Sequence, residues 1–211
     1  MFSCKKIAVV GIGYVGLSNA IALSRFNPVV AYDIDEGKVL ALNQKRSPLN
    51  ELDLVNYLAN EDLDLIATSS KNMAFEGAEY IIIATPTNYD ENINYFDTAT
   101  VESVIGDILE INNNAVIIIR STIPVGFVDF VRQKFRYENI IFCPEFLREG
   151  HSLADIFYPS RIVIGDEGPS SHSVAQLLLS SSNDKDVQVV FTGTQEAEAI
   201  KLFSNSYLAM R

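Results

Sequence analysis

Short apolar runs and segments with helical periodicity alternate along most of this chain. The apolar runs are rich in valine and isoleucine and are continuous rather than interrupted by polar residues, which is typical of strands covered on both faces. We predict strands at residues 6–10, 29–32, 63–67, 80–84, 116–119, 140–142, 161–164 and 187–191.

Between these runs, apolar residues recur at the spacing of an amphipathic helix. We predict helices at residues 15–25, 36–44, 52–59, 98–109, 127–135, 171–180 and 195–210. This alternation predicts an α/β, Rossmann-like, doubly wound and mostly parallel sheet of about eight strands, with right-handed crossovers. We expect residues 1–194 to form one domain and residues 195–211 to begin a long connecting helix, whose apolar stripe comprises Ala197, Ile200, Phe203 and Leu208.

The composition narrows the classes of partner. The 211 residues carry a formal net charge of −11, which argues against nucleic acid, because binding to a phosphate backbone needs a concentrated positive surface. No apolar stretch approaches the roughly 20 residues that span a bilayer, and glycines break the run after Lys5 and Lys6, so no signal peptide is predicted. Two cysteines do not make a disulfide framework and indicate reduced thiols, so we expect a cytoplasmic protein.

The segment "GIGYVG" matches the G-x-G-x-x-G pattern directly after one predicted strand and before a helix. Gly11 permits a tight turn, Gly13 lets the backbone approach a diphosphate, and Gly16 lets the helix lie close to the strand. Asp33 ends the next strand, where a carboxylate accepts hydrogen bonds from a ribose diol and repels a 2′-phosphate. The pattern predicts a dinucleotide site for NAD rather than NADP, and Lys38 is a candidate for a further contact to the ribose or diphosphate.

Ligands of such sheets bind beyond the carboxyl ends of the strands. The segments that follow three later strands are "ATPTN" (84–88), "RSTIPVG" (120–126) and "CPEFLREG" (143–150), and each combines a proline with hydroxyls or carboxylates. Individually these are ordinary helix-cap residues, but together they indicate a site. The polar stretch 88–98 is long for a connection, which is typical of a functional loop.

Two pairs of residues are candidates for catalysis. Glu145 and Glu149 share a face if their segment makes a helical turn; Arg148 then either pairs with them or leaves one carboxylate as a general base. Lys201 and Asn205 lie four apart on the last helix. They either form a solvated face or stabilise a developing alkoxide.

In order and across nearly the whole chain, the sequence resembles the UDP-glucose/GDP-mannose dehydrogenase family in the segments "AVVGIGYVGLSNAIALS", "IIIATPTNYDENINYFDTATVESVI", "IRSTIPVGF", "PEFLREGHSLADIFYPSRIVIG" and "AEAIKLFSNSYLAMR". The resemblance implies two successive NAD-dependent oxidations at C6 of a UDP-sugar, from UDP-glucose to UDP-glucuronate, by an enzyme that is a homodimer at full length. It also implies a sugar aldehyde held covalently by a cysteine, so that the second hydride can leave.

The resemblance also implies residue roles. It places NAD against Val15, Asp33, Lys38, Thr87, Thr122 and Glu149, in addition to the glycines. It places the sugar nucleotide against Glu145, Phe146, Leu147, Arg148, Glu149, Lys201 and Asn205. Within that set, Thr122 would help hold a catalytic water, Glu145 would be the base in thioester hydrolysis, and Lys201 and Asn205 would stabilise oxyanions.

The sequence departs from the family pattern at the nucleophile, because no "GGxCxPKD"-type motif occurs in it. We interpret Cys4 and Cys143 as structural thiols, treat His151 and His172 as surface residues, and predict no metal site. The chain ends within a predicted helix, so we expect it to be the N-terminal NAD-binding part of a longer enzyme that binds NAD without completing the oxidation alone.

Three alternatives remain from the sequence. The enzyme could act on GDP-mannose or a UDP-N-acetylhexosamine, since the residues here discriminate poorly between sugars. The chain could be a non-catalytic NAD-binding module, which would not need the four candidate catalytic residues together. A β-hydroxyacid dehydrogenase would share the glycine loop but gives no reason for "PEFLREG" or "KLFSN".

Overall fold

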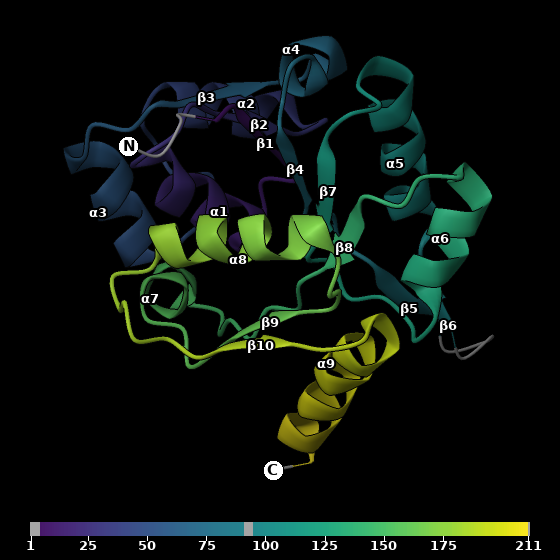
Figure 1. Cartoon of the computed structure of the whole chain (residues 1–211). Helices are drawn as coiled ribbons and strands as arrows, with labels where there is room; N and C mark the ends of the chain where they lie inside the picture. Colours follow the sequence, from purple (N-terminus) through teal and green to yellow (C-terminus); the bar gives the residue numbers. More distant parts are fainter. Residues whose placement is uncertain (1–4, 91–94, 211) are drawn as a thin grey trace.

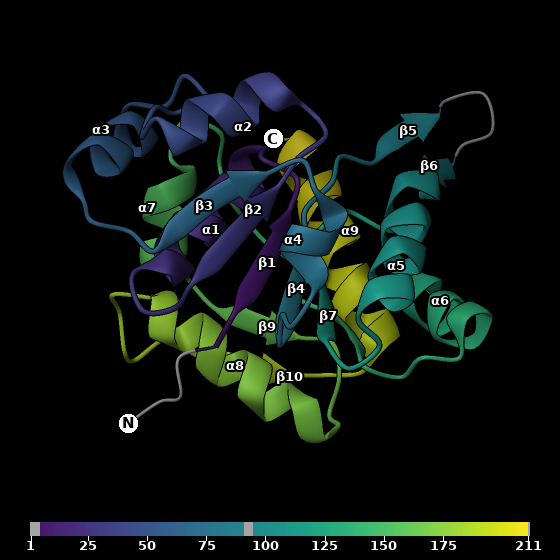
Figure 2. The same ribbon diagram turned by 90° about the horizontal axis from the view of Figure 1, so that it is seen from above.

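A six-stranded parallel sheet forms the centre of the molecule. The computed structural model describes residues 5–90 and 95–210, and Figure 1 shows the arrangement of their elements. The strands lie in the order β3-β2-β1-β4-β7-β8, and Figure 2 shows the first five side by side. Their bounds are β1 Ile7–Val10, β2 Val29–Tyr32, β3 Leu65–Thr68, β4 Tyr80–Ile83, β7 Val116–Ile119 and β8 Ile140–Phe142. The predicted α/β class is confirmed.

Helices cover both faces of this sheet, so its strands are buried on both sides. Along β1, Ile7 and Val9 belong to one apolar cluster, whereas Ala8 and Val10 belong to the other. The first cluster includes α1 Tyr14–Ser24, α2 Glu36–Asn43, α3 Leu52–Asn60, α7 Ser152–Phe157 and α8 Pro169–Ser181. The second includes α4 Lys71–Phe75, α5 Ala99–Ile111 and α6 Phe127–Phe135. This two-sided burial is the physical reason for the uninterrupted apolar runs.

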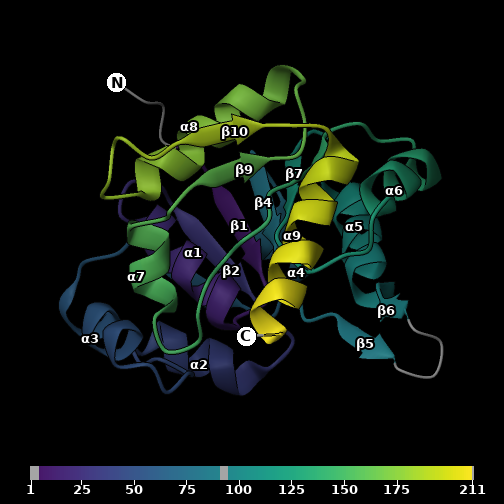
Figure 3. The same ribbon diagram turned by 90° about the horizontal axis from the view of Figure 1, so that it is seen from below.

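The last two predicted strands form, but they do not join the main sheet. β9 Ile162–Ile164 and β10 Val189–Phe191 pair in parallel with each other, as Figure 3 shows from below. A single antiparallel bridge from Phe142 to Gly165 connects them to the end of β8. Because β9 crosses that end instead of running beside it, the expected sheet of about eight strands is six strands plus a separate pair.

Several short elements were not predicted. α4 and α7 have five and six residues, too few to show a helical period. The polar stretch expected to be one long loop contains β5 Asn88–Asp90 and β6 Tyr95–Asp97, which pair in antiparallel orientation. Its residues 91–94 lie outside the described part of the chain. Among the described residues, no helix is both long and apolar enough to cross a bilayer.

The last helix, α9 Thr194–Ala209, is buried against the body of the domain along its first half. Ala197 is fully buried, whereas Phe203 is 76% exposed and Leu208 is 67% exposed. In Figure 1 the helix runs away from the sheet toward the C-terminus. The predicted apolar stripe is therefore covered at its start and open at its end.

Candidate active site

The strand order reverses between β1 and β4, and a cleft of about 400 Å³ lies at the carboxyl ends of the strands around this point. Ligands of doubly wound sheets bind at such a reversal. The cleft is lined by the glycine loop, by Asp33 and Lys38 after β2, by the segments after β4 and β7, and by residues that follow β8. Segments that are far apart in the sequence thus meet at the edge expected for a ligand.

The three glycines of the loop occupy three different environments. A Cβ on Gly11 would lie 2.7 Å from the carbonyl oxygen of Ala84 at the end of β4, and the residue has φ +96°. A Cβ on Gly16 would lie 1.8 Å from the carbonyl oxygen of Gly11. A Cβ on Gly13 would meet nothing within 4 Å, although the residue lines the cleft. Two glycines therefore allow close packing of the backbone, and the third leaves open space facing the cleft.

Asp33 is held directly against the glycine loop. Its Oδ2 accepts a hydrogen bond of 2.7 Å from the backbone N–H of Ile12, and its Oδ1 accepts one of 3.0 Å from Asp35. The ammonium of Lys38 lies 3.4 Å from the same Oδ2. The carboxylate is thus fixed beside the N-terminus of α1, where it can accept bonds from a ribose diol and disfavour a nearby phosphate.

The segments after β4 and β7 form the opposite wall of the cleft. The hydroxyl of Thr87 donates to the carbonyl oxygen of Thr122 over 2.7 Å, and the hydroxyl of Ser121 donates to the carbonyl oxygen of Thr85 over 2.7 Å. These cross-links hold the two loops at a fixed separation. Val15 and Glu149 also line the cleft.

Glu145 and Lys201 form a buried ion pair beside the cleft. The Lys201 ammonium donates to Oε1 of Glu145 over 2.7 Å and to the carbonyl oxygen of Glu145 over 2.6 Å. Their side chains are only 10% and 6% exposed. Lys201 is therefore not part of a solvated helix face, while Asn205, one turn further along α9, is exposed.

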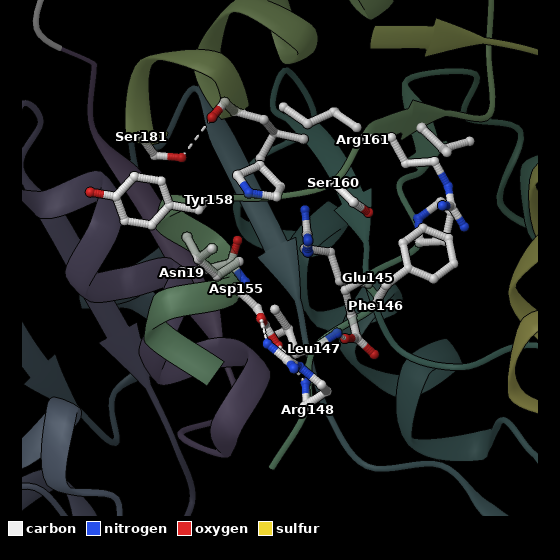
Figure 4. Close-up of a pocket in the computed structure, with 17 residues that line it drawn as sticks. Asn19, Glu145, Phe146, Leu147, Arg148, Asp155, Tyr158, Ser160, Arg161 and Ser181 are labelled. Atoms are coloured by element: carbon white, nitrogen blue, oxygen red, sulfur yellow. Dashed lines mark hydrogen bonds and ion pairs between the residues drawn. The ribbon is translucent and has the colours of Figure 1, made fainter. Parts of the chain in front are cut away.

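The helical turn considered for residues 145–149 does not form. The second carboxylate oxygen of Glu145 accepts the backbone N–H of Leu147 over 2.7 Å, which holds the segment in a non-helical conformation. Arg148 pairs with Asp155 over 2.7 Å instead of with either glutamate, as the dashed lines of Figure 4 show. Burial alone would raise the pKa of Asp155, but hydrogen bonds from Arg148 lower it below its ordinary value.

A second cavity of about 310 Å³ lies behind this segment. Figure 4 shows Phe146, Leu147 and Arg161 among its lining residues, and the guanidinium of Arg161 lies 4.4 Å from the ring centroid of Phe146. Four residues line both cavities and so belong to the wall between them: Arg120, Glu145, Leu147 and Arg148.

Glu198 fastens α9 to the rest of the domain, and sequence reasoning missed it. Its fully buried carboxylate accepts the backbone N–H groups of Gly126 over 2.6 Å and of Val128 over 2.9 Å, at the start of α6. Burial raises the pKa of Glu198 above its ordinary value. The same carboxylate holds the loop that carries Thr122 and the helix that carries Lys201, one turn further on. In the sequence, Glu198 directly follows Ala197 of the predicted apolar stripe and precedes Lys201 by three residues. An acid beside an apolar stripe is the signal that could have indicated a buried carboxylate.

Two buried polar groups of the described residues have no hydrogen-bond partner, namely the hydroxyl of Thr85 and the Nε–H of Arg120. Both residues line the cleft. Because buried polar groups are normally satisfied, both groups fit a polar ligand that enters from the cleft. Together with the open space at Gly13, they fit the dinucleotide that the glycine loop predicts.

The described cysteine and histidines take no part in the cleft wall. Burial raises the pKa of the Cys143 thiol to about 12, so the thiol is unreactive near neutral pH. His151 and His172 are exposed, and Cys4 lies outside the described residues. Among the residues that the structure describes, no group of three or more His, Cys, Asp or Glu could hold a metal ion.

Comparison with known proteins gives a consistent picture. The family model described as the UDP-glucose/GDP-mannose dehydrogenase family, NAD binding domain, matches residues 5–181. UDP-glucose 6-dehydrogenase of Campylobacter jejuni is 46% identical over 98% of this chain and 53% of its own length. The enzyme of the same name from Streptococcus pneumoniae is 42% identical over 98% of this chain and 54% of its own. The chain thus spans about half the length of these relatives.

Solved structures share the fold. A UDP-glucose dehydrogenase from Pyrobaculum islandicum superposes with a TM-score of 0.84 at 27% identity, over 98% of this chain and 50% of that one. A GDP-mannose dehydrogenase from Pseudomonas aeruginosa superposes with a TM-score of 0.85 at 24% identity, over 97% and 50%. At 24% identity, the similarity to the GDP-mannose dehydrogenase is evidence for a shared fold only.

Proposed function

Because this chain belongs to the UDP-glucose/GDP-mannose dehydrogenase family and matches its NAD-binding domain, we propose that it binds NAD and serves the oxidation of UDP-glucose to UDP-glucuronate. Two relatives that are more than 40% identical are both named for UDP-glucose. This favours UDP-glucose over GDP-mannose or a UDP-N-acetylhexosamine.

The residues of the cleft can hold NAD along its whole length. The backbone of the glycine loop and the N-terminus of α1 receive the diphosphate, and Asp33 with Lys38 receives the adenosine ribose. The loops carrying Thr87 and Thr122, with Glu149, receive the other half. When bound, NAD supplies the acceptor for hydride from C6 of the sugar.

Glu145 and Lys201 are the groups that handle protons and negative charge in this proposal. The ion pair with Lys201 fixes the carboxylate of Glu145 at the wall of the cleft, where in this proposal it accepts a proton from water. An ammonium has three N–H donors, and the contacts to Glu145 use two of them. The third N–H is left for an oxygen that carries negative charge, a role that Asn205 would share.

The observation that carries the proposal is the 2.7 Å hydrogen bond that the backbone N–H of Ile12 donates to the carboxylate of Asp33. This bond supports the proposal, because it holds a carboxylate suited to a ribose diol directly beside the glycine turn that we propose for the diphosphate. A non-catalytic module would need this arrangement too, but it gives no reason for a buried Glu145–Lys201 pair, whose desolvation is costly.

The second half of α9 exposes apolar side chains that a second copy of the enzyme could cover. Phe203 and Leu208 on the helix are 76% and 67% exposed, and Met210 just after its end is 80% exposed. Several large apolar side chains exposed together are typical of an interaction surface. We therefore propose that this helix pairs with a second copy in the full-length enzyme.

Isothermal titration of the chain with NAD⁺ and NADP⁺ tests the dinucleotide site. We expect binding of NAD⁺ and much weaker binding of NADP⁺, with the preference reduced in Asp33→Asn because the neutral amide no longer repels a 2′-phosphate. Absence of heat with NAD⁺ at millimolar concentration would refute the proposal. Thermal shifts of the NAD⁺ complex with UDP-glucose, GDP-mannose and UDP-N-acetylglucosamine then test the sugar, and we expect the largest shift with UDP-glucose.

A further inference from the structure

Arg120 is a buried cation whose side chain has no hydrogen-bond or ion-pair partner in the part of the chain that the structure describes. It follows β7 directly and is 8% exposed. Its Nε–H has no acceptor, and its guanidinium forms no ion pair with any described residue. Burial lowers the pKa of this guanidinium, but an arginine remains protonated in proteins, so the site carries a full positive charge.

The nearest carboxylate does not neutralise that charge. Glu145 lies close enough to act on Arg120 electrostatically, but its two oxygens are bound by Lys201 and by the N–H of Leu147, each over 2.7 Å. Two cations therefore face one carboxylate, and the group of three carries a net charge of +1. A buried and unsatisfied charged donor destabilises a fold, so packing gives no reason for an arginine at this position.

The position of Arg120 in the cleft gives such a reason. Asp33 marks the end of the cleft where the adenosine binds, on the β2 side of the strand reversal. A dinucleotide extends across this reversal, so its nicotinamide half lies over the ends of β4 and β7. Thr85 follows β4 and Arg120 follows β7, and both line the cleft. They carry the two unsatisfied buried groups found among the described residues.

We propose that Arg120 is a ligand-facing cation at the nicotinamide end of the cleft, and that its charge makes the domain bind NADH more tightly than NAD⁺. The oxidised nicotinamide ring carries one positive charge and the reduced ring none, so an unneutralised guanidinium nearby disfavours only the oxidised form. This inference rests on the proposed NAD site and adds to it a residue that distinguishes the two redox states.

Titrations of the chain with NAD⁺ and with NADH, in wild type, Arg120→Met and Arg120→Lys, test the inference. We expect wild type to favour NADH and Arg120→Met to reduce the ratio of the two Kd values by about fivefold, the order of magnitude for unit charges interacting across a partly screened cleft. Arg120→Lys keeps the charge and should keep most of the ratio. Arg46→Met is the control for the loss of one positive charge, because Arg46 is exposed and does not line the cleft.

Urea unfolding without ligand gives a second readout. Because methionine removes an unsatisfied buried charge, Arg120→Met should be at least as stable as wild type, whereas a purely structural arginine would leave a less stable variant. A Kd ratio that does not change in a folded Arg120→Met would overturn the inference while leaving the NAD site intact. If wild type binds neither dinucleotide, the proposed function fails and this inference fails with it.

Discussion

Replacing Gly13 by alanine separates the ligand-binding role of the glycine loop from its role in folding. Gly13 has φ −97° and ψ −174°, a backbone conformation that alanine also adopts. An added Cβ would meet no atom within 4 Å, so the fold itself offers no resistance. Alanine also reduces the conformational entropy of the unfolded chain. Where alanine can adopt the native backbone conformation, this stabilises the folded protein by about 0.4–1 kcal/mol. We therefore expect the free Gly13→Ala chain to be as stable as wild type or slightly more stable.

Binding of NAD should respond in the opposite direction. The new methyl group would stand in the cleft wall, where the backbone must approach the diphosphate closely. Forcing an extra carbon into a close contact costs about 1–3 kcal/mol, which corresponds to a Kd about 5- to 150-fold weaker. Titration calorimetry measures this change, and thermal unfolding of the free protein measures stability in the same samples.

Gly16→Ala is the matched control for this reasoning. Its Cβ would lie 1.8 Å from the carbonyl oxygen of Gly11, a backbone atom that cannot rotate away. We expect a loss of about 3 kcal/mol, or a fall in Tm of about 6–12 °C for a chain of this size. If Gly13→Ala binds NAD as tightly as wild type, the diphosphate does not approach this turn and the reasoning is wrong. If Gly16→Ala is as stable as wild type, the close approach of α1 to the turn is wrong.

Three further predictions concern buried groups. In a Cys4→Ser background, the Cys143 thiol, whose pKa burial raises to about 12, should react with a disulfide reagent at pH 8 only after unfolding, and rapid labelling of the native chain would contradict this. Lys201→Met should lose about 3–5 kcal/mol in urea unfolding because it leaves Glu145 buried without its cation; the double variant with Glu145→Leu should recover most of this, and an equally unstable double variant would argue against the pair. Glu198 has its pKa raised by burial above the ordinary 4.5, so its folded form holds the proton more tightly; its contribution to stability is full below pH 4.5 and is lost as the pH rises through the folded-state pKa. The free energy of unfolding of wild type relative to Glu198→Gln should therefore fall from pH 4.5 upward, and a difference that is constant with pH would refute this.

Local patterns predicted most of the central sheet. All six of its strands coincide with predicted apolar runs to within two residues. The turn at Gly11 and the carboxylate of Asp33 also followed from the sequence, because the geometry of a strand, a tight turn and a helix start depends on neighbouring residues. α4 and α7 were missed, because one or two helical turns do not repeat an apolar position often enough to be recognised.

Which distant residues meet was decided by the tertiary structure. Lys201 and Glu145 are separated by 56 residues in the sequence. No residue next to either of them in the sequence indicates that they form an ion pair. The pairing of Glu198 with the start of α6 and the isolation of Arg120 have the same origin, since they depend on how α9 and the end of β7 lie against other elements. The sequence by itself determined the α/β class, the glycine turn and the acid that follows the second strand, because backbone conformation and the burial of a face are encoded locally. The separation of β9 and β10 from the main sheet and the charges around the cleft arise only when elements cross in space, because burial and electrostatic interaction depend on distances that the order of residues along the chain does not contain.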